Sequence, residues 1–118
     1  MKRVAVTGLG VISPVGNDVP TFWNALCSGT CGIGPITKFD ATDYPVKLAA
    51  EVRNFDPKQY MEKLDILHSD VYTHFAMAAA CQAVADSGIA GTLDAERVGD
   101  YIGSGIGGIA TFMTEHSK

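Results

Sequence analysis

The chain has few cysteines and histidines, and neither type is arranged for metal or redox chemistry. There are three of each. No cysteine pair has the Cys-x-x-Cys spacing typical of zinc sites and redox dithiols, and no histidine pair has a metal-protease spacing. We therefore expect no metal site, no cofactor and only buried or bystander thiols. The residues concerned are Cys27, Cys31, Cys81, His68, His74 and His116.

The chain also lacks a basic run and a long apolar run. Its nine Lys and Arg are scattered and are outnumbered by thirteen Asp and Glu, for a formal net charge of −4. A nucleic-acid groove would show clustered basic residues with stacking aromatics, so nucleic acid is not an expected partner. The longest apolar run, around residues 76–81, is far shorter than the roughly 20 residues that span a bilayer, so no membrane contact is expected. Thr7 and Gly8 interrupt the apolar N-terminus, which argues against a signal peptide and for the cytoplasm.

An apolar fraction of 47% over 118 residues suits one globular domain or part of a larger one. Capping signals predict three helices. Asn17 or Asp18 can cap a helix that has Pro20 in its first turn and ends before Gly29. A second helix, residues 71–87, is apolar nearly all round at its centre, and we expect it to be buried. A third helix is expected over residues 109–115, and irregular helical turns over 57–67.

Three segments predict strands: residues 4–6, 46–53 and 97–102. The second alternates apolar and polar residues, which indicates a strand with one face partly in water. Residues 29–45 are rich in glycine and proline, a composition typical of an extended connection. The alternation of strands and helices predicts an α/β chain with a mixed or parallel sheet.

Two glycine-rich turns follow predicted strands. The second, Gly103 to Gly108, matches the Gly-x-Gly-x-x-Gly spacing of dinucleotide-binding loops, but it follows the third strand instead of the first. In the first, Thr7 to Gly16, Ile12 stands where a glycine belongs, and Pro14 prevents the helix that would hold a pyrophosphate. Three interpretations remain open from spacing alone: turns where two backbones pass closely, nucleotide loops, or loops lining another ligand.

The identities of the residues carry more information than the glycine spacing alone. Several separated motifs stand in one order over nearly the whole length. They are Lys2–Asn17, Thr21–Leu26, Gly32–Ile36, Phe39–Asp40, Ala49–Val52, Phe55–Pro57, Asp86–Gly88 and Ile102–Gly108. In these motifs the chain resembles the β-ketoacyl-[acyl-carrier-protein] synthases of type II, condensing enzymes of fatty-acid synthesis.

The resemblance implies a thiolase-like α/β fold, of which residues 1–118 would form the opening part of the N-terminal half, a mixed sheet with packed helices and no second domain. Members of the family condense an acyl chain with malonyl-carrier protein, and they usually work as homodimers. Their chemistry uses a cysteine nucleophile and two histidines, because a thiolate accepts acyl groups well and donors must stabilise the developing enolate.

No catalytic residue can be carried over to this chain. The family's nucleophilic cysteine lies downstream of the glycine hexad and its histidines lie further on, whereas Cys27, Cys31 and Cys81 stand in other segments. A polypeptide of these 118 residues is therefore expected to be inactive by itself.

One binding position can be carried over. Ile106 matches the isoleucine of the family's Gly-Ile-Gly-Gly motif, which borders the acyl pocket and can act as a gate. Gly105 and Gly107 would give its backbone freedom to move, and these three residues form the expected substrate-binding set. The alternative is that Ile106 is an ordinary core residue.

The acyl carrier protein is the implied partner, but docking through residues 62–69 is doubtful. Relatives carry several basic residues there, and this chain has only Lys63. Two other interpretations are kept: a non-catalytic module that pairs with itself or another chain, and a nucleotide-binding α/β domain.

Overall fold

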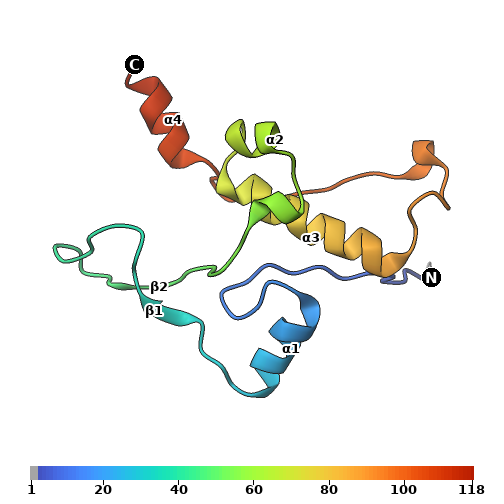
Figure 1. Ribbon diagram of the computed structural model, residues 1–118, viewed down its shortest axis with the longest axis horizontal. Helices are drawn as coiled ribbons and strands as arrows, with labels where there is room; N and C mark the ends of the chain where they lie inside the picture. Colours follow the sequence, from blue (N-terminus) through green and yellow to red (C-terminus); the bar gives the residue numbers. More distant parts are fainter. Residues whose placement is uncertain (1–2) are drawn as a thin grey trace. The chain divides into compact units, whose positions relative to one another are not determined.

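The computed structural model describes residues 3–118, in the element order shown in Figure 1. The elements are α1 (Val19–Cys27), β1 (Ile33–Pro35), β2 (Leu48–Ala50), the 3-10 turn η1 (Pro57–Gln59), α2 (Lys63–Leu67), α3 (Val71–Ser87), the 3-10 turn η2 (Ala95–Arg97) and α4 (Ile109–His116). The chain forms two compact units. One comprises residues 11–55, and the other comprises residues 3–10 together with 56–118.

In the unit of residues 11–55, α1 begins where its capping signals predict. The Asp18 carboxylate accepts hydrogen bonds from the Thr21 backbone N–H and from its hydroxyl, each at 2.8 Å. Pro20 lies in the first turn, where no N–H is required, and Gly29 adopts a left-handed φ of 69° after the helix. Before the helix, Ser13 and Gly16 pair through two backbone hydrogen bonds around a tight turn. The expectation that no helix starts at Pro14 is confirmed.

The same unit contains a two-stranded antiparallel sheet. Ile33 pairs with Ala50, and Pro35 with Leu48. The strand predicted over residues 46–53 is present only over 48–50, and β1 lies in the segment expected to be a plain connection. Leu48 is 58% exposed, because the described part of this unit places nothing over the apolar face of the sheet.

The other unit is built on α3, which ends at Gly88 with a left-handed φ of 63° as predicted. The predicted burial of this helix is wrong: among its residues only His74 and Ala78 are buried. Val71 and Met77 remain 50% and 39% exposed. An apolar helix can be buried only where neighbours cover all its faces, and the described residues cover some of them.

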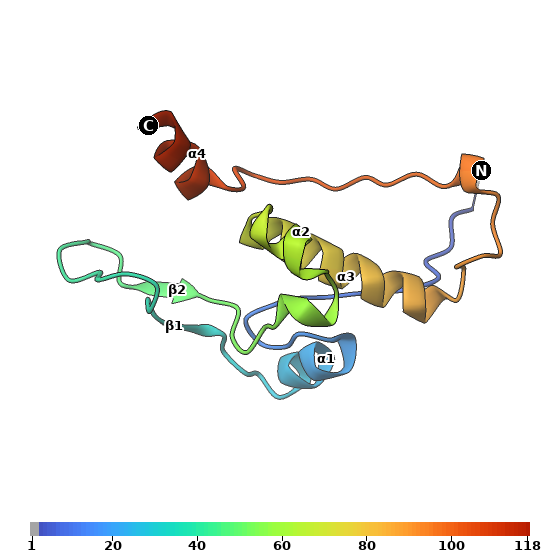
Figure 2. The same cartoon turned by 45° about the horizontal axis from the view of Figure 1, so that its top comes forward.

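The strands predicted at residues 4–6 and 97–102 are not strands in the structure. Figure 2 shows the stretch between η2 and α4 as a long connection. A strand is completed by hydrogen bonds to a neighbouring strand, and the described part of this unit contains none. Both stretches leave apolar side chains in solvent, with Val4 94% and Tyr101 98% exposed. The mixed sheet implied by the resemblance therefore stays a prediction.

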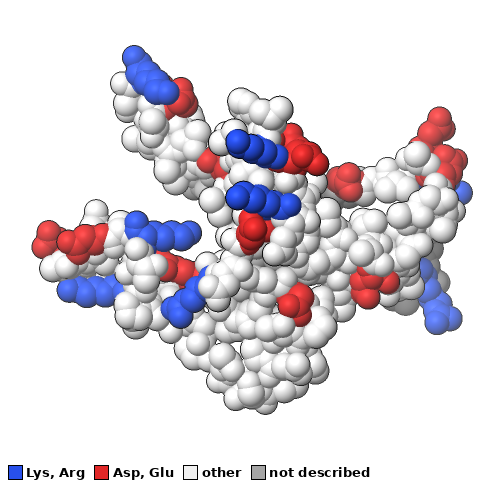
Figure 3. All heavy atoms as spheres, viewed as in Figure 1, with Lys and Arg blue, Asp and Glu red and all other residues white. Residues whose placement is uncertain are grey.

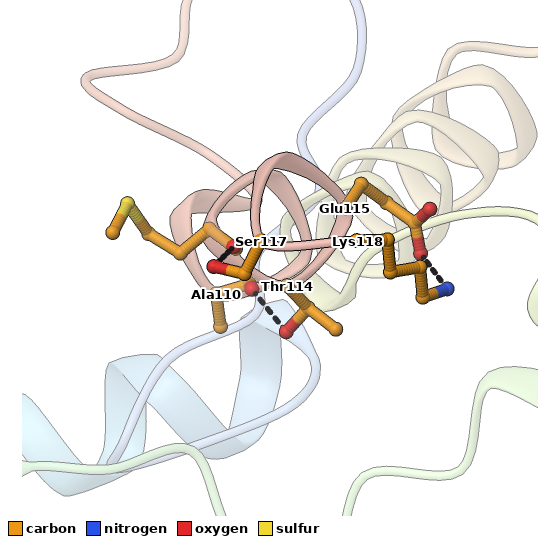
Figure 4. A network of polar contacts seen from close by, with 6 residues as sticks. Ala110, Thr114, Glu115, Ser117 and Lys118 are labelled. Carbon is orange, nitrogen blue, oxygen red and sulfur yellow. Dashed lines mark hydrogen bonds and ion pairs between the residues drawn. The ribbon is translucent and has the colours of Figure 1, made fainter.

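The predicted C-terminal helix is confirmed as α4. Figure 4 shows its last turns, where the hydroxyls of Thr114 and Ser117 donate to the carbonyls four residues earlier, Ala110 and Met113. Lys118 forms an exposed ion pair with Glu115 at 2.6 Å, which adds little stability in water. This end of the helix is therefore held mainly by hydrogen bonds within its own turns.

Candidate functional site

The glycine loop of residues 103–108 is open at its first part and tightly packed at its end. A methyl group added at Gly103 or Gly105 would meet no atom within 4 Å. A methyl group at Gly107 would come within 2.5 Å of the Tyr72 ring. Between these two parts, the Ile106 side chain is 85% exposed, so Ile106 is not a core residue in the described structure.

Asp70, at the start of α3, holds the other end of the loop. The Thr111 hydroxyl in the first turn of α4 donates to Asp70 Oδ1 at 2.5 Å. A methyl group on Gly108, whose φ is 72°, would overlap Asp70 Oδ2. The left-handed backbone at 108 favours glycine, and a side chain there would have to displace the Asp70 carboxylate.

This geometry disfavours a nucleotide at the loop. A pyrophosphate would have to lie at the N-terminus of α4, where free backbone N–H groups and the helix dipole attract anions. The Asp70 carboxylate lies against Gly108, the N-cap of α4, and is bonded to Thr111 in the first turn. A negative side chain therefore occupies the place that a phosphate would need.

The first glycine turn is a packing contact. A methyl group on Gly8 would overlap the carbonyl oxygen of Ala83, and one on Gly10 would overlap that of Ala79. Between them, the Leu9 N–H donates to Asp86 Oδ2 at 2.9 Å. The interpretation of this turn as a place where two backbones pass closely is confirmed.

The cysteines and histidines lie apart on separate elements. All three cysteines are exposed and free, so the expectation of bystander thiols is met and that of buried thiols is not. His74 is buried, with Nε2 3.1 Å from the Ser69 hydroxyl. That hydroxyl donates to the Asp65 carbonyl, so the Ser69–His74 contact is structural. Among residues 3–118 no group of three or more His, Cys, Asp or Glu could hold a metal ion.

A cleft of about 660 Å³ lies beside α2, η1 and the first half of α3. Its lining includes one basic residue, Lys58, and two acidic residues, Glu62 and Asp65. On the face that Figure 3 shows, acidic side chains lie close to the basic ones. This surface has no positive patch that would attract an acidic carrier protein by charge.

The structure brings together a set that sequence reasoning missed. Ile106, Gly105 and Gly107 lie in one loop as predicted, and their role in substrate binding stays a prediction. Asp70, Tyr72 and Thr111 surround the end of that loop. The only sequence signal for Asp70 was an acidic residue before a helix, which predicts an N-cap. Its side chain makes no capping bond to α3.

Comparisons with known proteins agree on one family. Residues 1–118 match the family model described as beta-ketoacyl synthase, N-terminal domain. The chain is 50% identical over 109 residues to 3-oxoacyl-[acyl-carrier-protein] synthase 2 of Coxiella burnetii, covering 92% of this chain and 26% of that protein. It is 42% identical over 118 residues to the protein of the same name from Staphylococcus aureus strain COL, covering 99% of this chain and 28% of that protein.

A solved structure is also similar. The chain superposes on the ishigamide ketosynthase/chain length factor with a TM-score of 0.65 and 33% sequence identity, covering 80% of this chain and 23% of that chain. The chain spans about a quarter of the length of the curated relatives it matches. No helix in residues 3–118 combines the length and apolar character needed to cross a bilayer.

Proposed function

We propose that this chain, which belongs to the β-ketoacyl synthase family, acts as the N-terminal part of a 3-oxoacyl-[acyl-carrier-protein] synthase. Such an enzyme is an acyltransferase that condenses an acyl chain with malonyl-carrier protein in fatty-acid biosynthesis. The observation that carries the proposal is the match of residues 1–118 to the family's N-terminal domain, with relatives of that name at 50% and 42% identity.

Within that enzyme, residues 1–118 would form the opening part of a single thiolase-like α/β domain. We propose that the segments at residues 4–6 and 97–102 become strands of a mixed sheet once neighbouring strands are present. Their exposed apolar side chains support this, since Val4, Val6 and Tyr101 are each more than three-quarters exposed. Burial of such groups is the main driving force for completing a domain.

In the reaction, the loop around Ile106 would form part of the wall of the acyl-binding pocket. Ile106 presents an apolar side chain to solvent beside backbone that has open space at Gly103 and Gly105. An acyl chain is apolar, and pockets for such ligands are lined mainly by apolar side chains. No residue of this chain is assigned as the nucleophile or as either catalytic histidine.

The proposed partners are the acyl carrier protein and a second copy of the complete enzyme. The mixed charge around the cleft at Lys58, Glu62 and Asp65 argues that carrier docking does not depend on this surface. The relatives are named 3-oxoacyl-[acyl-carrier-protein] synthase 2, which supports the carrier protein as the acyl donor.

A chimeric synthase tests the proposal. The aligned part of this chain, 99% of its length, replaces the matching segment of the Staphylococcus aureus strain COL relative, and condensation of acyl-carrier protein with malonyl-carrier protein is measured. We expect activity, because 42% of the aligned residues are identical. A chimera that folds and pairs normally but does not condense these substrates would contradict the proposal.

The 118-residue polypeptide alone should not accept an acyl group. Cys27, Cys31 and Cys81 are exposed, yet none is matched to the family's nucleophile. Incubation with acyl-carrier protein or a cerulenin-type reagent, followed by mass spectrometry, is expected to show no stoichiometric adduct. A full thioester on any of the three cysteines would show that the chemistry has been assigned wrongly.

A further inference from the structure

The glycine loop has one free end and one held end. At Gly103 and Gly105 there is open space where a side chain would be, whereas Gly107 and Gly108 are packed against Tyr72 and Asp70. Glycine at the first pair is not required by contact. At the second pair a side chain would have to displace the Tyr72 ring at Gly107 and the Asp70 carboxylate at Gly108, where the left-handed φ of 72° also favours glycine. The loop therefore has open space on the side of Ile106 that precedes the held pair, and close contacts on the side that follows it.

A single side chain joins the beginnings of two helices. Asp70 precedes α3, but its carboxylate makes no capping bond there. It accepts the Thr111 hydroxyl bond across 41 residues of sequence and lies against Gly108, the first residue before α4. A carboxylate near helix N-termini is also favoured by their dipoles. Asp70 thus fixes where α4 begins relative to α3.

We propose that Asp70, supported by Tyr72, is a positioning residue for the acyl site. It holds Gly107 and Gly108 as a fixed pivot, and Ile106 swings about that pivot. The position of the pivot then sets how far the Ile106 side chain can withdraw, and therefore which acyl chains fit. This inference rests on the proposed function, because it assumes that Ile106 borders the acyl chain.

The test removes the Thr111–Asp70 hydrogen bond while leaving the Asp70 side chain in place. Thr111→Val removes the donor hydroxyl and keeps the size of an exposed side chain, so it should not unfold the chain. Hydrogen–deuterium exchange of the backbone over residues 103–112 is measured on the full 118-residue chain and on the chimeric synthase. We expect exchange at least about tenfold faster, the effect of losing one hydrogen bond to a charged group.

Two further variants sharpen the result. Asp70→Asn keeps an oxygen that can accept the Thr111 hydrogen bond, so exchange over residues 103–112 should stay slow. Asp70→Ala has no acceptor, so exchange there should become faster. Asp86→Ala is the matched control, since Asp86 also binds a glycine segment, through the Leu9 N–H. It should speed exchange near Gly8 and Gly10 and leave residues 103–112 unchanged.

The kinetic measurement in the chimera is the ratio of kcat/KM for carrier proteins loaded with short acyl chains to kcat/KM for those loaded with long acyl chains. Thr111→Val should change this ratio while Asp86→Ala does not. Unchanged exchange over 103–112 in Thr111→Val overturns the pivot, whatever the kinetics show. Faster exchange with an unchanged ratio also overturns it, provided that Ile106→Phe alters the ratio. If Ile106→Phe leaves the ratio unchanged, the proposed role of Ile106 beside the acyl chain is wrong. The pivot inference, which depends on that role, is then wrong as well.

Discussion

Threonine hydrogen bonds stabilise two exposed carboxylates in the unit of residues 11–55. Thr37 donates its N–H to Glu51 Oε1 at 3.1 Å and its hydroxyl to Oε2 at 2.6 Å. The Thr37 hydroxyl bond is the largest cause that lowers the pKa of Glu51 below its ordinary value. Thr42 donates both its hydroxyl and its N–H to Asp40 Oδ1, and these bonds lower the pKa of that carboxyl.

Thr37→Val should raise the pKa of Glu51 toward its ordinary value, because the charged form loses a donor. A carboxyl whose pKa is lower in the folded state contributes stability above its unfolded pKa, and this is lost as pH falls through the folded pKa. The variant should therefore show less of this acid dependence. NMR titration of the Glu51 carboxyl measures the change. Thr42→Val is the control: it should move the pKa of Asp40 and leave that of Glu51 in place.

Gly10→Ala should destabilise the unit that contains α3. The added methyl group would overlap the Ala79 carbonyl oxygen, and neither backbone can move without losing contacts. Overpacking of this kind costs about 1–3 kcal/mol. Thermal unfolding followed by circular dichroism of the helices measures it. Gly105→Ala, which meets no atom within 4 Å, should have little effect, and an equal loss in both variants would contradict the contact.

At the scale of elements, local signals predicted the helices better than the strands: β2 lies inside the strand predicted over residues 46–53, and β1 was missed. Asp18, Pro20 and Gly29 mark the ends of α1 within a few residues, and Gly88 marks the end of α3. A helix satisfies its hydrogen bonds within one segment, so its limits are encoded nearby. Strands depend on a partner. Residues 4–6 and 97–102 have strand-like patterns but no described neighbour, while β1 was missed because its partner β2 is needed to define it.

Asp18→Ala should weaken α1 by about 1 kcal/mol, the usual cost of removing a helix N-cap. The carboxylate accepts two bonds from Thr21, and alanine offers no acceptor. Loss of helical circular dichroism and faster amide exchange over residues 19–24 measure the effect. Asp18→Asn keeps an acceptor and should retain most of the helix; if it behaves like alanine, the cap bond is not what holds α1.

On the scale of the whole molecule, apolar surface is left uncovered in both units. Ala78 is the one buried apolar residue among those described, while large side chains such as Trp23, Ile102 and Phe112 are more than three-fifths exposed. Monomeric proteins seldom expose extended apolar patches. This is consistent with a chain that spans about a quarter of its relatives.

The isolated 118-residue chain should therefore bind a dye such as ANS and self-associate with rising concentration. Size-exclusion chromatography with light scattering measures the association, and the chimeric synthase, in which the apolar surface would be covered, is the control for dye binding. A monodisperse monomer without dye binding would contradict this expectation, and would also count against the chain being a pairing module.

The candidate site was predictable only in part at this scale. The motif around Ile106 indicated which loop to consider, because glycine spacing is visible in the sequence. The contact of Asp70 with Gly108 and Thr111 joins residues about 40 positions apart, and no local pattern encodes such a pairing. The glycine spacing also does not show which glycines are closely packed. The structure shows close contacts of Tyr72 and Asp70 with Gly107 and Gly108, and open space at Gly103 and Gly105.

The contact of Gly8 and Gly10 with α3 also determines how the N-terminal segment is aligned. Two residues of extended chain advance about 6.6 Å, close to the roughly 6 Å between Ala79 and Ala83 along a helix. The two glycines therefore meet successive helical turns. Sliding the segment by one residue would press the Leu9 side chain into the helix backbone and break its bond to Asp86. The alternation Gly-Leu-Gly therefore allows this alignment of the N-terminal segment along α3 and excludes the alignments shifted by one residue. The spacing of the turns of α3 thus determines where the N-terminal segment lies.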